Sequence, residues 1–393
     1  MQDYIITKLI GLKDIKVKNV EVDEQIIIDI QLTKPRVQKC PNCGSVHMYY
    51  HDKRKQKIKD LPIQNKSVIL NLTRYRYKCK ECGKKSEKQP KFVQKKCQMT
   101  DRLKLQIYKE YNDVVKVKKI AETLNISTAT IQREIDKIRV QRKTLSEVMC
   151  IDEFKGDSGK EKYQVSIGNG KDHEITDILP SRKIDELSKY FSKITKEERE
   201  KVKYYVSDMS PIFKKIREIY FPNSVYITDR YHFIRQVTWA LENVRKEEQK
   251  KMNRNDRIYF KRSRSLLHKT RKQLTDEEKL KVSLMLEKNE NIRQAYKLKE
   301  RFYQQVLTKK TKEEGKKALR EWVQEAEESK IKQFKASIIA FTNWEESISN
   351  SFEYEYSNGY LEGIHNRIKS IKRAAFLMPN FERFRTKILL TLA

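Results

Sequence analysis

Long apolar segments are missing from this sequence. None of its uncharged apolar runs approaches the roughly 18–20 residues that a membrane helix needs. The N-terminal segment carries Asp3 and lacks the pattern of a cleavable signal peptide. Internal repeats and low-complexity linkers are also absent. Because 38% of the 393 residues are apolar, the chain can build packed cores and is not expected to be intrinsically disordered. We expect a soluble intracellular protein of two or three domains.

Acidic residues are outnumbered. The chain carries 86 Lys and Arg against 54 Asp and Glu, a formal charge of +32. The excess is concentrated, since residues 34–104 alone hold 21 basic and 5 acidic side chains. A concentrated basic field attracts polyanions and speeds their arrival. The charge distribution therefore favours a nucleic acid as partner over a surface that is basic only for solubility.

Cysteine is scarce, but four of the six cysteines form two pairs. Each pair has the pattern Cys-X-X-Cys-Gly, and the four are Cys40, Cys43, Cys79 and Cys82. The glycine allows the backbone to turn tightly around a metal, and four thiolates suit a structural Zn²⁺ with a closed tetrahedral shell. Disulfides are the alternative, but nothing indicates an oxidising compartment. His47 and His51 could replace a cysteine ligand, whereas Cys97 and Cys150 are expected to be ordinary thiols.

Residues 1–98 are expected to be rich in β-structure. The alternating apolar residues of one strand are Ile26, Ile28, Ile30 and Leu32. The segments 68–72 and 74–77 alternate in the same way and lead into the second cysteine pair. Arg74 and Arg76 would project from one face there. In this basic context we expect them to contact phosphates rather than only to solubilise the strand.

Residues 99–145 change to a helical period. The apolar face of a first helix is Val117, Ile120, Ala121 and Leu124. Asn125 ends that helix and Ser127 can cap the next one. The exposed start of the second helix carries Thr128, Thr130, Gln132 and Arg133. This layout is typical of a helix-turn-helix, whose second helix reads base edges in the major groove. A helical hairpin without that role is the alternative.

From residue 146 onward the pattern predicts an α/β layer. Strands are expected near 148–154, 162–168, 174–179, 202–207 and 225–228, with helices beginning near 183, 211 and 230. This alternation predicts a mixed sheet.

A long helical segment follows, over about 240–345. It contains the capping-box pattern Thr275-Asp-Glu-Glu278 and the apolar residues Leu280, Leu284 and Met285. We therefore expect an all-helical insertion. A final helix begins after Gly359, with the apolar stripe Leu361, Ile364, Ile368 and Ile371.

Three acidic residues stand out by position. Asp152 lies within an apolar strand, Asp208 follows the strand that ends at Ser207, and Glu362 lies on the last helix. Such carboxylates can hold two Mg²⁺ ions that serve a phosphodiester displacement.

Other residues compete for these roles or support them. Asp229, at the end of the next strand, competes with Asp208, and Glu153 competes with Asp152. Alternation along a strand directs Asp152 and Glu153 to opposite faces, so only one can join a given site. Lys369 and Arg373 share the helix of Glu362 and could hold a phosphate backbone against the site.

The order of these motifs resembles that of the DDE transposases of the ISL family of bacterial insertion sequences. The motifs are Ile-Asp-Glu-Phe at 151–154, Val-Ser-Asp-Met at 206–209, Thr-Asp-Arg-Tyr-His-Phe at 228–233, and Ser-Asn-Gly-Tyr-Leu-Glu-Gly-Ile-His-Asn-Arg-Ile-Lys at 357–369. Because they follow the paired cysteines and the helix-turn-helix segment, the resemblance covers nearly the whole chain.

The resemblance implies an RNase H-like catalytic fold interrupted by a helical insertion. It assigns the catalytic acids to Asp152, Asp208 and Glu362, and gives Asp229 and His232 a structural role. It implies a transposase that binds double-stranded DNA at the terminal inverted repeats of its own element, cuts there, and joins the released 3′-OH to target DNA. Mg²⁺ is the expected catalytic metal, for which Mn²⁺ can substitute. A homodimer or larger assembly is expected, in the bacterial cytoplasm at the nucleoid.

The expected fold class is multidomain, combining α+β and α/β parts. Its segments are a zinc-binding β module at 1–98, a helix-turn-helix at 99–145, a first part of the mixed-sheet catalytic domain at 146–245, an all-helical insertion at 246–345, and a C-terminal catalytic part at 346–393. Two other functions are a DNA-binding regulator without nuclease activity and a nuclease without strand transfer. The presence of all three acids argues against the regulator.

Overall fold

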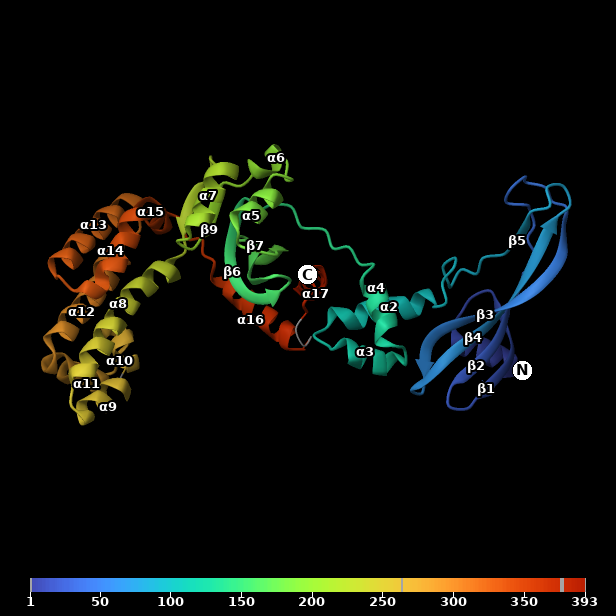
Figure 1. Ribbon diagram of the computed structural model, residues 1–393, viewed down its shortest axis with the longest axis horizontal. Helices are drawn as coiled ribbons and strands as arrows, with labels where there is room; N and C mark the ends of the chain where they lie inside the picture. The colour runs from blue at the N-terminus through green and yellow to red at the C-terminus, as the bar shows by residue number, and fades with distance from the viewer. Residues whose placement is uncertain (1, 263, 375–377, 393) are drawn as a thin grey trace. The chain divides into compact units, whose positions relative to one another are not determined.

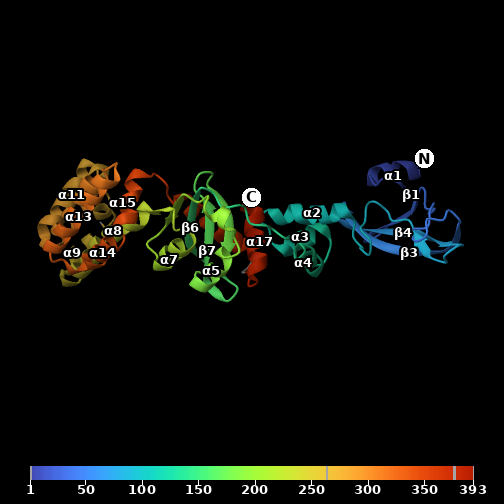
Figure 2. The ribbon, with the colours of Figure 1, turned by 90° about the horizontal axis from the view of Figure 1, so that it is seen from above.

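The computed structural model describes residues 2–262, 264–374 and 378–392, which form two compact units. Within these residues, unit 1 consists of 2–140, 370–374, 378 and 386–391, and unit 2 consists of 141–262, 264–369, 379–385 and 392. Each unit contains a five-stranded sheet together with helices (Figure 1, Figure 2). No helix among the described residues is long and apolar enough to cross a membrane.

The sheet of unit 1 has the strand order β1-β2-β4-β3, with β5 paired to β4. Its elements are α1 (Gln2–Ile10), β1 (Ile15–Val22), β2 (Ile26–Leu32), β3 (Met48–Ile63), β4 (Lys66–Cys79) and β5 (Lys85–Glu87). β2 runs parallel to β4, and the other pairs are antiparallel. Strands β3 and β4 form a long hairpin, and its turn residues Gln64 and Asn65 have φ values of 48° and 62°. A tight two-residue hairpin turn favours this left-handed conformation.

Alternating side chains of β2 and β4 build the core of this sheet. The residues Ile26, Ile28, Ile30 and Leu32 are buried, as predicted. On β4 the buried partners are Val68, Leu70 and Leu72. One face of the two strands is therefore apolar because every second residue points to it.

Three helices follow in unit 1, namely α2 (Asp101–Asn112), α3 (Val117–Leu124) and α4 (Thr128–Ile135). Asn125 ends α3 in the left-handed conformation, with φ 50°. Ser127 caps α4, since its Oγ accepts a hydrogen bond from the Thr130 backbone N–H at 3.3 Å. Leu124 and Ile131 are buried in an apolar core shared with α2. The predicted helix break and cap are confirmed, and the segment consists of two short helices around a tight turn.

The sheet of unit 2 has the strand order β10-β9-β6-β7-β8. Its strands are β6 (Val148–Ser158), β7 (Glu161–Asn169), β8 (Glu174–Leu179), β9 (Tyr204–Ser207) and β10 (Val225–Thr228), and the helices between them are α5 (Ile184–Phe191), α6 (Lys196–Arg199) and α7 (Pro211–Tyr220). β6, β7 and β8 are antiparallel, whereas β9 is parallel to both β6 and β10. The predicted mixed sheet is confirmed.

A helical segment follows β10. Its helices are α8 (Arg230–Lys251), α9 (Arg254–Arg262), α10 (Arg264–His268), α11 (Asp276–Lys288), α12 (Glu290–Arg301), α13 (Lys312–Glu328), α14 (Lys335–Asn343) and α15 (Glu345–Glu353), with short 3-10 or π turns at 271–273, 302–306 and 332–334. Three buried aromatic rings lie at its centre. The ring centroid of Phe302 is 5.1 Å from that of Trp322 and 5.5 Å from that of Phe341. This core is continuous with that of the sheet.

The sequence predicted the start of α11 correctly, but it did not predict which of the helix's apolar residues are buried. Thr275 and Glu278 form the predicted capping box. Leu280 and Leu284, however, are 63% and 47% exposed, and Met285 alone of the predicted apolar set is buried, beside Val282. The helix packs into the core of unit 2 through these two residues, so two leucines remain in solvent.

Two helices complete the chain, α16 (Gly359–Ala374) and α17 (Phe381–Leu392). The predicted stripe of α16 is buried, and it consists of Leu361, Ile364, Ile368 and Ile371. Because these residues recur at three- and four-residue intervals, they lie on one side of the helix.

Two helical glycines provide a test of this packing. An alanine Cβ at Gly315 in α13 would overlap the buried ring of Phe352, whereas nothing lies within 4 Å of the same atom at Gly363 in α16. We expect Gly315→Ala to lower the free energy of unfolding by about 1–3 kcal/mol. Gly363→Ala should leave it unchanged or raise it by up to about 1 kcal/mol. Thermal unfolding of both variants measures this, and equal midpoints would contradict the packing described.

Candidate functional site

Three aspartates come to the same level of the unit 2 sheet. In the parallel pair of β6 and β9, Cys150 lies opposite Val206. Two residues further on, Asp152 lies within β6 and Asp208 lies just past the end of β9, so the two acids are at the same level of the sheet. The residue before Asp208 is likewise paired with the residue before Asp229 in β9 and β10. The register therefore carries acids from three distant segments to one region of the sheet.

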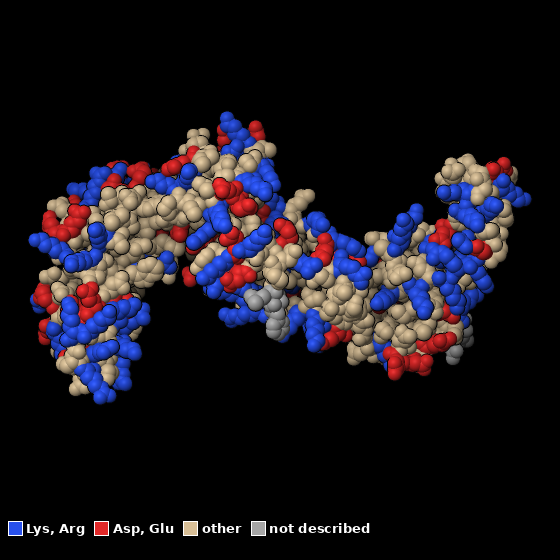
Figure 3. Space-filling model, in the orientation of Figure 1, with Lys and Arg blue, Asp and Glu red and all other residues tan. Residues whose placement is uncertain are grey.

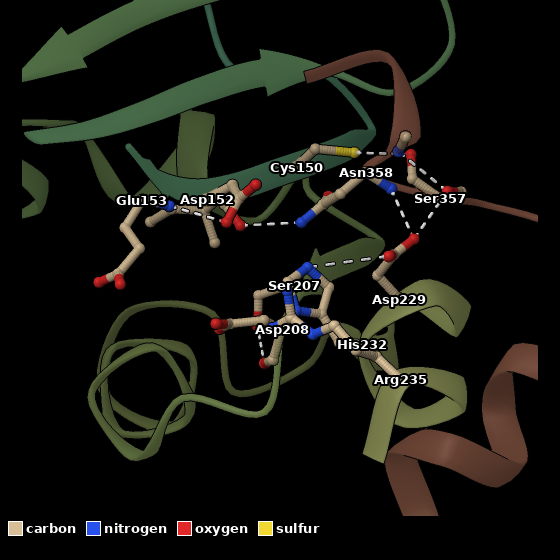
Figure 4. Close-up of polar contacts among 12 residues, drawn as sticks. Cys150, Asp152, Glu153, Ser207, Asp208, Asp229, His232, Arg235, Ser357 and Asn358 are labelled. Atoms are coloured by element: carbon tan, nitrogen blue, oxygen red, sulfur yellow. Dashed lines mark hydrogen bonds and ion pairs between the residues drawn. The ribbon is translucent and has the colours of Figure 1, made fainter. Parts of the chain in front are cut away.

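Asp152 is largely buried, with 14% of its side chain exposed. Its Oδ1 accepts a hydrogen bond from the Glu153 backbone N–H at 2.8 Å. Burial, followed by the charge of Asp208, raises the pKa of Asp152 to about 8. The Glu153 side chain points away from that of Asp152 (Figure 4) and pairs with Arg182 Nη1 at 2.7 Å. The two neighbours thus face different surroundings.

Asp208 lies between the end of β9 and the beginning of α7. Its Oδ1 is buried and has no hydrogen-bond partner among the described residues. Burial, followed by the charge of Glu153, raises the pKa of Asp208 to about 6. Leaving a buried carboxylate oxygen without a donor is costly. A cation at this position would remove that cost.

Asp229 has a different environment, because its oxygens are used within the protein. Oδ1 accepts hydrogen bonds from Ser357 Oγ at 2.7 Å and from the Asn358 backbone N–H at 3.1 Å. Asn358 Nδ2 in turn donates to the Ile151 carbonyl oxygen at 3.0 Å. His232 Nε2 lies 4.0 Å from Asp229 Oδ2. Asp229 therefore holds the residues that precede α16 at the end of β10, and Asn358 links the same residues to β6.

Glu362 lies in the first turn of α16 and is exposed. One turn later His365 is buried, with Nε2 2.8 Å from Ser166 Oγ and Nδ1 3.9 Å from Asp152 Oδ2. Its ring stacks on Phe154 with centroids 5.0 Å apart. Since residues three apart on a helix are neighbours, the contact of His365 with Asp152 brings the first turn of α16 close to that acid.

The donor set suits a hard divalent cation. Asp152, Asp208 and Glu362 offer oxygen atoms only, which Mg²⁺ prefers. The buried Oδ1 of Asp208 has no hydrogen-bond partner among the described residues and could bind a cation. The three carboxylates are not drawn together within 4.8 Å, because among the residues that the structure describes only the cysteine cluster has three or more potential ligands this close. The chemistry fits a metal site whose ligands remain apart.

The four paired cysteines do meet. Cys40 Sγ lies 3.5 Å from Cys82 Sγ, and Cys43 Sγ lies 3.6 Å from Cys79 Sγ. All four sulfurs are within 4.8 Å of one another, and none forms a disulfide. Thiolates at about 2.3 Å from a tetrahedral zinc are separated by roughly 3.8 Å. The observed spacing therefore fits one zinc ion.

The backbone around this cluster agrees with the predicted turns. Gly44 and Gly83 have φ values of 74° and 69°, which a residue with a Cβ rarely adopts. A hydrogen bond from the Lys84 backbone N–H lowers the pKa of Cys82 to about 6. His47 and His51 do not belong to the group.

Helix α4 presents the predicted polar residues. Thr128 and Arg133 are exposed, and Thr130 and Gln132 are half-buried. Arg133 Nε donates to the Ala129 carbonyl oxygen at 3.2 Å. Figure 3 shows many Lys and Arg side chains over the visible face of unit 1.

Arg133 also lines a basic cavity of about 530 Å³. The cations in its lining are Lys59, Lys96, Lys104, Arg133 and Lys137. The Lys104 side chain is only 8% exposed, and its Nζ donates to Gln94 Oε1 at 3.2 Å. The sequence analysis missed the four lysines, because β3, the segment before α2, α2 and the residues after α4 each contribute one.

The two arginines of β4 are less available than predicted. Only 5% of the Arg74 side chain is exposed, and its guanidinium donates to Gln56 Oε1 at 2.9 Å and pairs with Glu87 at 3.2 Å. The predicted phosphate contact of Arg74 does not fit this burial. Alternation places Arg74 on the apolar face, where protein acceptors hold it. Arg76 is 38% exposed and is ion-paired with Asp52.

The two basic residues of α16 that were predicted to hold a phosphate backbone, Lys369 and Arg373, are exposed. Lys369 Nζ donates to Asn366 Oδ1 at 3.1 Å. Lys369 belongs to unit 2 and Arg373 to unit 1.

Comparison with known proteins defines the class of this chain. A transposase family of the DDE type, ISL3, matches residues 149–388. The zinc finger of the transposases IS204, IS1001, IS1096 and IS1165 matches residues 36–82. Because the first match covers more than half of the 393 residues, the chain belongs to the ISL3 family of DDE transposases and is an enzyme of that class.

A curated relative agrees with this family. The chain is similar to the transposase for insertion sequence element IS1001 of Bordetella parapertussis, with 23% identity over 367 residues. The alignment covers 90% of this chain and 88% of that protein. The resemblance seen in the sequence is therefore confirmed at the level of the family.

The sequence analysis missed two residues of the acidic site. Asn358 links Asp229 to β6, and His365 packs against Asp152. Both lie in the segment 357–369, which carries the family resemblance, and their places next to Glu362 were the available signal. Only the fold shows which of these polar residues turn inward.

The cysteine cluster generates a metal prediction. We expect about one zinc per chain by elemental analysis, because the four sulfurs have tetrahedral spacing. Cys79→Ser should release the metal and weaken DNA binding while leaving the thermal unfolding of unit 2 unchanged. Cys97→Ser is the control and should keep its zinc, since Cys97 lies outside the cluster. A zinc content below about half an equivalent in the unmodified protein would refute a structural site.

Proposed function

We propose that this transposase recognises the terminal inverted repeats of its own insertion sequence, and that Asp152, Asp208 and Glu362 are the carboxylates with which it cuts and rejoins DNA. The observation that supports this best is the parallel register, which makes Asp152 and Asp208 level on neighbouring strands. Both have raised pKa values, as is common for acids of functional sites.

The strand order supports an RNase H-like catalytic domain. Three antiparallel strands are followed by two parallel ones, and α16 returns to the same sheet after the helical segment. In this proposal residues 146–245 and 346–393 form the catalytic domain and 246–345 the insertion. Residues 1–98 form the zinc-binding module and 99–145 the helix-turn-helix.

The three carboxylates would hold Mg²⁺, or Mn²⁺ in its place. Such ions supply positive charge that activates the attacking oxygen and stabilises the leaving oxygen of a phosphodiester. The protein fixes the positions of the carboxylate oxygens. Asp208 offers an oxygen that no protein donor occupies, and Asp229 with Asn358 fixes the start of α16, so that Glu362 is held near the two aspartates.

Recognition of DNA is assigned to unit 1. Thr128, Thr130, Gln132 and Arg133 of α4 would face base edges in the major groove. The lysines around Arg133 and the half-exposed Arg76 would contact phosphates. Arg74 has a structural role instead. Lys369 would hold the backbone near the catalytic acids, and Arg373 would contact DNA from unit 1.

Joining two transposon ends requires that both are handled together, so we propose a homodimer or larger assembly that works at the nucleoid. One experiment separates the functions. Labelled transposon ends and target DNA are incubated with the protein and Mg²⁺. Joined product supports the transposase mechanism, cleavage without joining indicates a nuclease, and binding alone indicates a regulator.

The catalytic assignment predicts a matched set of variants. Asp152→Asn, Asp208→Asn and Glu362→Gln each remove a charge but keep the shape, so cleavage and joining should both fall by at least about a hundredfold. Binding of transposon ends should persist, because it belongs to unit 1. Asp229→Asn is the control, since its amide oxygen can still accept the bonds from Ser357 and Asn358. An inactive but folded Asp229→Asn beside an active Asp208→Asn would reverse the assignment.

The DNA-binding assignment predicts two kinds of loss. Arg133→Ala should relax discrimination at one base position, at a cost of about 1–3 kcal/mol. Arg76→Ala should weaken binding to all sequences alike and reduce the salt dependence by about one unit of slope. Titrations of specific and random duplexes at several salt concentrations measure both effects. Equal losses on specific and random DNA for Arg133→Ala would remove its role in base recognition.

A further inference from the structure

Strand β3 carries a row of lysines on one side. Lys53, Lys55, Lys57 and Lys59 alternate with other residues where β3 pairs with β4 without interruption, and all four are exposed. We call them the lysine row. Because side chains on one side of a strand recur about every 6.6 Å, the row is about 20 Å long, which corresponds to roughly six base pairs of DNA. β3 is also an edge strand, and lysines on an edge can serve only to prevent aggregation.

Lys59 connects the lysine row to helix α4. It lines the basic cavity together with Arg133 of α4, Lys96 and Lys137. The positive charges therefore continue from β3 to the helix to which base recognition is assigned. A row that only prevents aggregation need not adjoin that helix, so this continuity favours the backbone of a DNA duplex as the partner of the lysine row.

Backbone hydrogen bonds join the helices to the same end of β3. The Lys59 backbone N–H donates to the Gln98 carbonyl oxygen at 2.9 Å, and the Thr100 backbone N–H donates to the Lys59 carbonyl oxygen at 3.0 Å. At the turn of the hairpin, Asn125 Nδ2 donates to the Asn65 carbonyl oxygen at 2.6 Å. The hairpin is thus held at two places, once before α2 and once at the turn between α3 and α4.

Asp60 is the buried centre of this connection. Only 1% of its side chain is exposed, and it lies on the opposite side of β3 from the lysine row. Its Oδ1 accepts hydrogen bonds from Thr100 Oγ1 and Arg102 Nε, both at 2.7 Å, and its Oδ2 accepts one from Arg102 Nη2. Thr100 also caps α2, and Arg102 also donates to the Ile10 carbonyl oxygen. Removing one partner would leave a buried charge unpaired, so this network resists displacement of α2 from β3.

We propose that Asp60 is a positioning residue, which fixes the lysine row in register with α4 so that both bind one continuous stretch of a transposon end. The row holds the backbone of the duplex, while α4 reads bases at a set distance from it. Loss of Asp60 would let the helices shift relative to β3 without removing a contact to DNA. This proposal rests on the proposed function only for the assignment of base recognition to α4.

Salt titrations test the lysine row. The full chain with Lys55→Ala and Lys57→Ala should lose about two units of salt slope on any duplex, because two phosphate contacts are removed. The positions that lose protection from hydroxyl radicals in this variant locate the row on the DNA. The control is Lys16→Ala with Lys18→Ala, since these exposed lysines lie on β1 at the other edge of the sheet. An unchanged slope in the β3 variant, or an equal loss in the control, would overturn the proposal.

A lengthened probe tests the register. Two base pairs are inserted into the transposon end, between the backbone positions located by the lysine variant and the base at which Arg133→Ala loses discrimination. The insertion turns the helix by about 70°, so the unmodified chain should bind the lengthened probe at least about tenfold more weakly than the natural end. Equal binding of the two probes would show that the lysine row and α4 are not held in register.

A double variant tests Asp60 itself. Asp60→Leu with Arg102→Met removes both charges, so neither is left buried without a partner. Its penalty for the lengthened probe should fall below about threefold. Arg102→Lys keeps the charge but loses the forked geometry and should give an intermediate penalty. Asp14→Asn is the control, because it removes only an exposed ion pair with Lys91.

The outcomes separate this proposal from the proposed function. A double variant that retains its zinc and the tenfold penalty would remove the role of Asp60, and so would an Arg102→Lys variant with the full penalty. Neither result involves cleavage or the discrimination of bases by Arg133. Equal binding of the natural end and a random duplex by the unmodified chain would instead contradict the proposed function, and with it this proposal.

Discussion

The acidic site depends on the hydrogen bonds that Asp229 accepts from the residues before α16. Helix α16 follows the whole helical segment in the sequence, so no local tendency returns it to the sheet. One carboxylate accepts both the Ser357 hydroxyl and the Asn358 backbone N–H, and the Asn358 amide reaches the Ile151 carbonyl in β6. These bonds connect β10, α16 and β6. Together with the contacts of the buried His365 to Ser166 and Asp152, they hold the first turn of α16 on the sheet.

The apolar core of unit 2 also stabilises the sheet that carries the acidic site. The apolar core of unit 2 extends from Leu145 beside the sheet to Phe352 in α15, through the rings of Phe302, Trp322 and Phe341. Because this core is continuous, the sheet and the helical segment form one compact unit. Helix α8 contributes to it with Phe233 and Val237. Helix α8 is thus held in place by its buried side.

How much could be predicted from the sequence depended on how local the physical cause was. The strand β2 and the stripe of α16 follow from their period alone, and Asn125 and Ser127 mark the turn before α4 through local backbone chemistry. The burial of Arg74 depends on acceptors from β3 and the segment after β4, which no local pattern shows. The exposure of Leu280 has a similar cause, because the packing of α11 on α12 decides which apolar face is covered. At the acidic site, spacing alone left Asp208 and Asp229 in competition. The structure distinguishes the two, because Asp229 Oδ1 accepts a hydrogen bond from Ser357, whereas Asp208 Oδ1 accepts none from the described residues.

Asp208 has a buried oxygen without a hydrogen-bond partner among the described residues, and the pKa of the neighbouring Asp152 is raised. Both facts bear on the lifetime of the protein. A ligand that binds only the folded state raises its stability by mass action. A cation between these acids would therefore relieve a cost that the cation-free enzyme carries permanently. Copies without a bound cation would then be the ones closest to local opening, which is the state that proteases attack. The metal proposed for catalysis would thereby also lengthen the lifetime of the enzyme.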